Sequence, residues 1–312
     1  MKKTFLYFCL LFIVQTAFAA DSLYVREQQI PILIDRIDNV LYEMRIPAQK
    51  GDVLNEITIQ IGDNVDLSDI QAIRLFYSGV EAPSRKGEHF SPVTYISSHI
   101  PGNTRKALES YSVRQDEVTA PLSRTVKLTS KQPMLKGINY FWVSIQMKPE
   151  TSLLAKVATT IPNAQINNKP IDITWKGKVN ERHVGIGVRQ AGDDGSAAFR
   201  IPGLVTTNNG TLLGVYDIRY NSSVDLQEKI DIGVSRSTDK GQTWEPMRVA
   251  MTFKQTDGLP HGQNGVGDPS ILVDEKTNTI WVVAAWTHGM GNERAWWNSM
   301  PGMTPDETAQ LM

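Results

Sequence analysis

This 312-residue sequence has a single cysteine and almost no net charge. The single cysteine is Cys9, which lies inside an N-terminal apolar segment, so the rest of the chain has no thiol and no disulfide. A fold without disulfides must be stabilised by the size of its core. The formal net charge is −1, from 32 lysines and arginines against 33 aspartates and glutamates. Such a balance gives no electrostatic reason to expect nucleic acid or an anionic membrane as a partner.

Signatures of metal binding and phosphate binding are also lacking. The five histidines do not fall at metal-ligand spacing, and no glycine-rich loop of the phosphate-binding type is present. We therefore expect neither a metal ion nor a cofactor. Hydrophobic residues make up 41% of the chain and charged residues 21%, values typical of a globular protein. An anionic ligand would need local positive charge, so individual arginines become the residues to follow.

The longest apolar run lies at the N-terminus. Lys2 and Lys3 precede a mostly apolar run from Phe5 to Val14, and residues 17–19 read Ala-Phe-Ala, which is a cleavage signal. The run is shorter than the roughly 20 residues that a membrane-spanning helix needs. We predict a signal peptide at residues 1–20, no membrane span, and an exported protein that is periplasmic, attached to the cell surface or secreted.

Residues 21–180 have the patterning of an all-β unit. β-Branched and aromatic residues recur in four short segments, and these are predicted strands, at 53–61, 70–77, 140–147 and 171–175. Turn-rich stretches separate these strands, and strands at this spacing along the chain are typical of a β-sandwich. Sandwiches often bind sugars, so this unit is a candidate for carbohydrate binding. The polar run at 176–183 predicts the domain boundary, which we place at residue 180.

Two tryptophans of this unit have two interpretations. Residues 140–147 alternate between apolar odd positions and more polar even ones, which places Trp142 on the face opposite the apolar residues. Trp142 and Trp175 could serve as stacking platforms for sugars, but burial in a core is the favoured interpretation.

A weak internal repeat follows the boundary. Pro202 and Pro269 each open a predicted hairpin, the first formed by 201–205 and 211–216 and the second by 268–272 and 279–283. Residues 230–234 and 247–251 supply a third and a fourth strand to the first unit. Four-stranded units in succession are typical of the blades of a β-propeller. Residues 181–312 are therefore predicted to be the start of a propeller, and an incomplete one.

Blade topology sorts the polar residues of this region between two ends. Antiparallel strands place the start of the first strand and the loop after the second strand at the same end. Arg200, Arg219, Asp225 and Asp268 occupy such positions, and we expect them to gather at one end of the propeller. The octapeptide STDKGQTW, residues 237–244, lies between the third and fourth strands, so it should lie at the opposite end.

The octapeptide matches the Asp-box pattern S-x-D-x-G-x-T-W through Ser237, Asp239, Gly241, Thr243 and Trp244. An aspartate at this position can bond the backbone of its own turn, and the glycine can take positive φ. The tryptophan can pack the turn onto the blade. We interpret the Asp box as a structural turn and not as a catalytic site.

The order Phe199-Arg200-Ile201-Pro202, Arg219, Asp225 and Asp box resembles that of the sialidases (neuraminidases), which remove terminal sialic acid from glycans. The resemblance covers roughly residues 183–290. It implies an all-β fold in which an N-terminal β-sandwich precedes the first blades of a six-bladed propeller, with sialylated glycans as partners. It also implies that Asp boxes of this kind are BNR repeats of the propeller.

The resemblance assigns a role to each polar residue at the predicted site. Arg200 is implied to belong to an arginine triad that grips the sialic acid carboxylate, which suits the planar, bidentate guanidinium. Arg219 is implied as a second contact, near the carboxylate or the 4-hydroxyl, and Asp225 as the general acid/base. Asp268 is implied to contact the 4-hydroxyl, with capping of the turn before Pro269 as an equal alternative.

The family's nucleophile has no candidate in this sequence. Sialidases use a tyrosine polarised by a glutamate, because a carboxylate nucleophile would be repelled by the substrate's own carboxylate. We expect that tyrosine, its glutamate and the two other arginines beyond Met312, so the chain is interpreted as the N-terminal portion of an exo-sialidase with a retaining mechanism. The alternatives are a sialic-acid-binding lectin that does not hydrolyse, and a trans-sialidase or intramolecular lyase.

Overall fold

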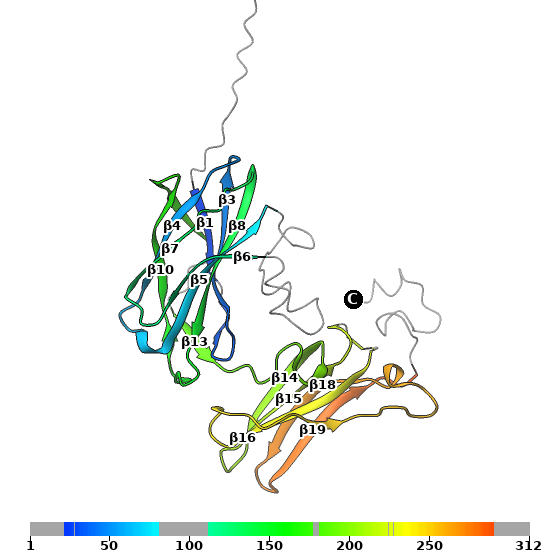
Figure 1. Ribbon diagram of the computed structural model, residues 1–312. Coiled ribbons are helices and arrows are strands. Elements are labelled where there is room, and N and C mark those ends of the chain that lie inside the picture. Colours follow the sequence, from blue (N-terminus) through cyan, green and yellow to red (C-terminus); the bar gives the residue numbers. More distant parts are fainter. Residues whose placement is uncertain are drawn as a thin grey trace, which may run out of the picture.

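The computed structural model describes residues 22–27, 29–80, 112–176, 181–223, 225–226 and 228–289. The predicted signal peptide lies outside these ranges. Within them every regular element is a strand or a short 3-10 helix, so the predicted all-β class is confirmed. Figure 1 shows the strands in two lobes that follow one another along the chain.

The described residues of the first lobe form thirteen strands and one 3-10 helix. They are β1 (Ser22–Glu27), β2 (Ile32–Leu33), β3 (Asn39–Ala48), β4 (Leu54–Ile61), η1 (Leu67–Asp69), β5 (Ile70–Gly79), β6 (Val113–Thr119), β7 (Thr125–Thr129), β8 (Gly137–Met147), β9 (Lys156–Val157), β10 (Thr159–Ile166), β11 (Lys169–Pro170), β12 (Asp172–Lys176) and β13 (Arg182–Gly185). A six-stranded sheet, in the order β12-β1-β3-β8-β5-β6, packs on a four-stranded sheet, in the order β11-β10-β4-β7. The predicted sandwich is therefore present.

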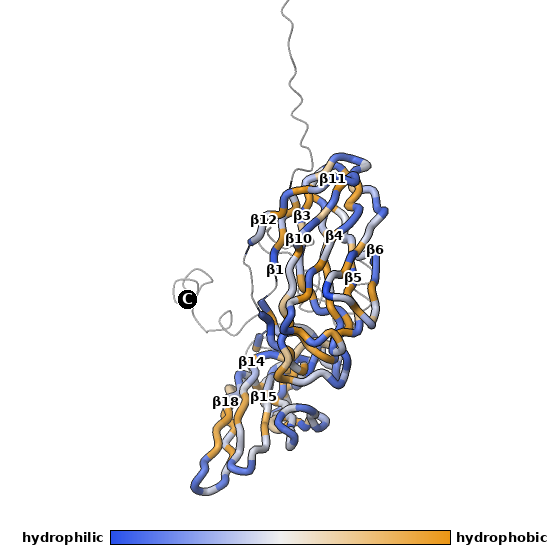
Figure 2. Tube along the Cα trace, turned by 90° about the vertical axis from the view of Figure 1, so that its left-hand side faces the viewer, coloured by the Kyte–Doolittle hydropathy of each residue, from blue (hydrophilic) through white to orange (hydrophobic). Residues whose placement is uncertain are grey.

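The sandwich core lies between the two sheets, where apolar side chains of β3, β4, β5, β8 and β10 meet. Figure 2 shows hydrophobic segments along β3, β4 and β5. The apolar odd positions of 141–147 are all buried in this core, as their alternation predicts. Trp142 is 1% exposed on the other face and stacks on Phe76, with ring centroids 3.9 Å apart. Trp175 is partly buried and meets Tyr42 edge-on. Trp142 is buried in a small cluster with Val40 and Phe76, and Trp175 packs against the sandwich core, so neither is an exposed platform.

Strand pairing with the sandwich continues past residue 180, where the sequence predicts the domain boundary. β13 (Arg182–Gly185) pairs parallel with β2 and antiparallel with β9. Arg182 is only 3% exposed and donates hydrogen bonds to the carbonyl oxygens of Ile30 and Val40, at 2.9 and 2.8 Å. The polar run is thus not a free linker at its C-terminal end, because its arginine satisfies buried carbonyl groups.

The second lobe begins with a four-stranded antiparallel sheet in the order β14-β15-β16-β17. Its elements are η2 (Asp193–Gly195), β14 (Ala198–Thr206), β15 (Leu212–Arg219), β16 (Ile230–Ser237) and β17 (Arg248–Met251), followed by η3 (His261–Gln263) and a hairpin of β18 (Val266–Asp274) and β19 (Thr279–Trp286). Val215, Ile232 and Val266 form a buried cluster between sheet and hairpin. These units have the predicted form of one blade and the start of another, and the six-blade count stays a prediction.

The two hairpins share an irregular corner at their prolines. The β14–β15 register shifts between Arg200 and Gly203, and the β18–β19 register shifts between Gly267 and Ser270. The residue before each proline has positive φ, 52° for Ile201 and 56° for Asp268. Positive φ is an outlier for a β-branched residue, and such strain is found preferentially at functional sites. Asp268 therefore holds the place in its hairpin that Ile201 holds in the first.

Candidate functional site

Strand register brings the predicted site residues to one end of the first blade. Arg219 ends β15, where it pairs with Ala198 of β14 and Ile230 of β16. Arg200 lies on β14 within the same corner. Asp225 lies in the loop of residues 220–229, whose ends are joined by the hydrogen bond from the Tyr220 N–H to the Lys229 carbonyl oxygen, at 3.3 Å.

Two guanidinium groups converge on one carboxylate oxygen. The Nη1 atoms of Arg200 and Arg219 donate to Asp225 Oδ1, at 3.0 and 2.6 Å. The same two Nη1 atoms each donate to the Ser223 carbonyl oxygen at 3.0 Å. Arg219 is buried, whereas the side chains of Arg200 and Asp225 are 43% and 52% exposed. The cluster thus has a fixed inner arginine and a solvent-accessible outer pair.

The two arginines also set the protonation of Asp225. The hydrogen bond from Arg219 is the main cause that holds the pKa of this carboxyl below its usual range, and the charges of Arg219 and Arg200 add to it. Asp225 is therefore an anion in this arrangement at neutral pH. A group of the same charge and shape, such as a ligand carboxylate, would find the same donors.

Asp217 is a site residue that the sequence interpretation missed. It has no exposed surface, and its Oδ2 accepts from Nε and Nη2 of Arg219, at 3.1 and 2.7 Å. Its Oδ1 accepts from the backbone N–H of Asp268 at 2.9 Å. Burial raises the pKa of Asp217, and the bonds from Arg219 and Asp268 oppose that rise. The carboxylate links the inner arginine of the first blade to the strained corner of the second.

A sequence signal for Asp217 exists in hindsight. Asp217 and Arg219 are two residues apart on one strand, so their side chains lie on the same face. On a strand whose other residues are almost all buried, opposite charges on one face indicate a buried ion pair.

Asp268 joins the cluster through its backbone. Its N–H binds Asp217, but its carboxylate is exposed and accepts no hydrogen bond from the residues that the structure describes. No contact between this carboxylate and Arg200, Arg219 or Asp225 is found among them. The backbone position of Asp268 is nevertheless fixed, because the adjacent Gly267 packs against Asp217. A Cβ added to Gly267 would lie 3.4 Å from each carboxylate oxygen of Asp217.

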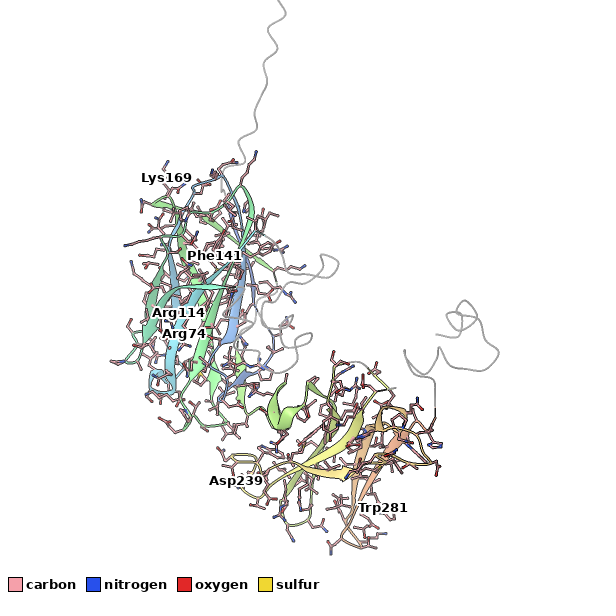
Figure 3. The ribbon with its side chains drawn as sticks, turned by 45° about the vertical axis from the view of Figure 1, so that its right-hand side comes forward. Arg74, Arg114, Phe141, Lys169, Asp239 and Trp281 are labelled. Atoms are coloured by element: carbon pink, nitrogen blue, oxygen red, sulfur yellow. The ribbon has the colours of Figure 1, made fainter. Side chains whose placement is uncertain are left out.

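The Asp box lies at the other end of the same sheet. Ser237 pairs with Leu212 at the end of the β15–β16 ladder opposite Arg219 and Ile230. Asp239, labelled in Figure 3, accepts hydrogen bonds from Ser237 Oγ at 2.8 Å and from Thr243 N and Oγ1 at 3.0 and 2.6 Å. These bonds lower its pKa to about 2, with the Thr243 side chain as the largest cause.

The remaining Asp-box residues complete the turn. Gly241 has φ of 89°, which glycine adopts without strain, and its N–H donates to Ser237 Oγ at 2.8 Å. Trp244 packs over β15, since a Cβ added to Gly214 would lie 3.6 Å from its ring. All these contacts are internal to the turn and its blade, which supports the structural interpretation.

We expect Asp239→Ala to lower the melting temperature at pH 7 without changing turnover per folded molecule. The depressed pKa means that the ionised carboxylate stabilises the fold above the unfolded pKa of about 4, and that this stabilisation is lost as pH falls toward 2. The gap in melting temperature between wild type and Asp239→Ala should therefore narrow between pH 5 and pH 2. Asp63→Ala, another exposed acid, is the control; a gap independent of pH would contradict the account.

Two features are absent from the part of the chain that the structure describes. It holds no group of three or more His, Cys, Asp or Glu side chains placed to bind a metal ion. It also holds no helix with the length and apolar character required to cross a membrane.

Comparison with known proteins identifies relatives along the whole chain. Residues 20–170 match the family described as the N-terminal domain of BNR-repeat neuraminidase. The chain is 56% identical to a sialidase of Bacteroides fragilis, over all of this chain and 58% of that protein. An anhydrosialidase of Macrobdella decora is 31% identical over 31% of this chain and 15% of its own length.

A solved structure supports the same relationship. The Hadza microbial sialidase Hz136 superposes with a TM-score of 0.75 and 60% sequence identity, over 91% of this chain and 55% of that one. The chain therefore spans between half and two thirds of the length of these two sialidases.

Proposed function

The chain belongs to the sialidase (neuraminidase) family, and we propose that the whole protein is an exo-sialidase that releases terminal α-linked sialic acids from glycoproteins, glycolipids and oligosaccharides. The observation that carries this proposal is the convergence of Arg200 and Arg219 on a single carboxylate oxygen. Sialic acid is a sugar whose anomeric carbon bears a carboxylate, so an enzyme for it needs a cationic fork of this kind.

Each residue of the cluster has a role in the proposed reaction. Arg200, the more exposed arginine, grips the substrate carboxylate, and Arg219 provides a second contact from its buried position. Asp268 extends its free carboxylate toward the 4-hydroxyl. The nucleophilic tyrosine, its glutamate and two further arginines are not assigned within this chain, and the proposal requires them in the rest of the protein.

Asp225 must change partners in order to act as an acid. Without ligand it is ionised and bound to both arginines. A substrate carboxylate that binds Arg200 removes one of these cations from Asp225, which raises the pKa of Asp225 toward that of a proton donor. Asp225 then takes up a proton from solvent and gives it to the glycosidic oxygen as the bond to the leaving group breaks. In the second half of a retaining reaction it takes a proton from the attacking water.

Arg200→Ala is expected to raise KM for an α-sialoside by about 10- to 100-fold, because it removes a charge-assisted hydrogen bond to the substrate carboxylate. Arg236→Ala makes the same chemical change on an exposed arginine near the Asp box and should leave KM unchanged. Steady-state kinetics of the whole protein decide between these outcomes. An unchanged KM in Arg200→Ala would remove the carboxylate-gripping role.

The released product separates the proposed hydrolase from its alternatives. A hydrolase gives free sialic acid, an intramolecular lyase gives an anhydro form, and a trans-sialidase gives a new sialoside. The partial similarity to an anhydrosialidase makes this distinction necessary. NMR of the product from 3′-sialyllactose should show free sialic acid with retained configuration first. Binding without any product would support a lectin instead.

We further propose that the protein is exported, on the basis of the basic start, the apolar run and the Ala-Phe-Ala sequence within residues 1–20. N-terminal sequencing of the protein recovered outside the cytoplasm should begin at Asp21 or close to it. Recovery of the intact N-terminus would contradict this proposal.

A further inference from the structure

A cavity lies at the base of the loop that carries Asp225. It has a volume of about 640 Å³, which is within the usual range for sites that bind small molecules. The residues that line it are Tyr220, Lys229, Asp231, Lys254, Gln255, Pro260 and His261. None of them has a role in the carboxylate-gripping cluster. They come from the ends of the 220–229 loop, the start of β16, the segment after β17 and the segment before β18.

A buried carboxylate organises the floor of this cavity. Asp231 is 3% exposed, and its Oδ2 accepts from the Tyr220 hydroxyl at 3.0 Å. Its Oδ1 lies 2.7 Å from His261 Nε2. Both oxygens are thus engaged by two rings from different segments, whose centroids lie 6.0 Å apart. The carboxylate holds the two rings in place and is itself screened from a ligand, so the cavity is built before any ligand arrives.

The rim of the cavity carries positive charge. Lys229 Nζ lies 4.4 Å from the centroid of the Tyr220 ring. Lys254 and Gln255 are exposed, and neither forms a hydrogen bond or ion pair with a residue that the structure describes. The ammonium group of Lys229 likewise forms no hydrogen bond or ion pair with a described residue, and its contact is with the Tyr220 ring. Two lysines therefore line a cavity in which Asp231, the one carboxylate among the described lining residues, is already engaged, and this favours an anion.

The cavity shares a structural element with the proposed active site. Tyr220 and Lys229 are the two ends of the loop that carries Asp225, and they are joined by a backbone hydrogen bond. Tyr220 also directly follows Arg219. The loop that carries Asp225 thus begins and ends in the wall of this cavity.

We propose that the cavity binds an anionic sugar of the substrate glycan, one that carries a carboxylate or a sulfate group and is not the residue being cleaved. Lys229 and Lys254 pair with the anionic group, and Gln255 bonds a sugar hydroxyl. The rings of Tyr220 and His261 pack against the apolar face of the sugar. This inference rests on the proposed sialidase function and names a specificity that the arginine cluster alone does not provide.

The test compares two classes of substrate on the whole protein. One class is a sialoside with a neutral leaving group, and the other carries a second sialic acid or a sulfated N-acetylglucosamine next to the cleaved residue. We expect Lys254→Ala to lower kcat/KM about 3- to 10-fold for the anionic class and to leave the neutral class unchanged. Added NaCl should diminish the wild-type preference for the anionic class, because exposed charges are screened. The disialyl and the sulfated substrates distinguish the two sources of charge.

Lys276→Ala is the matched control, since this exposed lysine lies in the turn between β18 and β19, at the far end of that hairpin. Equal losses on both classes in Lys254→Ala, or no loss on either, would overturn the proposal. A protein that hydrolyses no sialoside would overturn the proposed function instead. In that case, NMR titration of the protein with N-acetylglucosamine 6-sulfate still tests the cavity: weaker binding by Lys254→Ala than by Lys276→Ala supports it, and equal or absent binding contradicts it.

Discussion

Asp225→Asn is expected to lower kcat for 3′-sialyllactose by about 100- to 10,000-fold, the range for loss of a positioned general acid. The amide oxygen can still accept hydrogen bonds from Arg200 and Arg219, so the loop should keep its position. What the amide cannot do is donate a proton to the departing oxygen or take one from water. The loss should therefore appear in kcat and not as a loss of folded protein.

The leaving group provides an internal check on that result. A 4-methylumbelliferyl sialoside leaves as a stabilised anion and needs less protonation than lactose does. The loss in Asp225→Asn should thus be smaller for the fluorogenic substrate than for 3′-sialyllactose. Equal losses on both substrates would mean that Asp225 acts by holding the arginines and not as an acid. Thermal denaturation of the variant serves as the control for folding.

Asp217→Ala is expected to destabilise the protein by about 3–5 kcal/mol, the usual cost of removing one partner from a buried ion pair. Arg219 is 1% exposed and would keep its charge without the two hydrogen bonds that Asp217 accepts. The backbone N–H of Asp268 would lose its acceptor as well. Denaturant unfolding of the whole protein measures this cost, with the exposed Asp172→Ala as the control that should change little.

A double-mutant cycle separates charge pairing from packing. Because Arg219→Ala removes the charge that Asp217 compensates, adding Asp217→Ala to it should cost much less than Asp217→Ala costs alone. Additive losses would show that the two side chains are energetically independent, contrary to their contact in the structure. The free energies of unfolding of the wild type, the two single variants and the double variant give this coupling energy directly.

Much of the fold can be predicted from the sequence, because period-2 alternation carries a local signal. The alternation of 140–147 predicts a strand with one core-facing side. The two hairpins are also predicted, but Pro202 and Pro269 do not open their first strands: each lies within its strand, at a register shift. Antiparallel topology then predicts that Arg200, Arg219 and Asp225 share one end of a blade, and their hydrogen bonds bring them together there. Strand β13 is harder to predict from the sequence, because a polar run gives no local sign that its arginine is buried.

The details that make the site work depend on contacts between distant residues. Whether the Asp217 carboxylate pairs within its strand or reaches Asp268 in the next hairpin is settled by packing, which a local pattern does not encode. The positive φ of Ile201 cannot be predicted from the sequence either, because a β-branched residue rarely adopts it and only the surrounding strands impose it. The cavity beside Tyr220 joins four separate segments, and no single one of them predicts it.

Recognition of a substrate carboxylate by the arginine cluster is the central step of the proposed function. The direct test compares kcat/KM of the whole protein for an α-sialoside and for its methyl ester, in which one added methyl group removes the charge of that carboxylate. We predict turnover of the sialoside and a loss of at least about 100-fold for the ester, as expected when a charge-assisted pair and the release of Asp225 are both removed. Equal turnover of the two compounds, or turnover of neutral glycosides alone, would contradict the account.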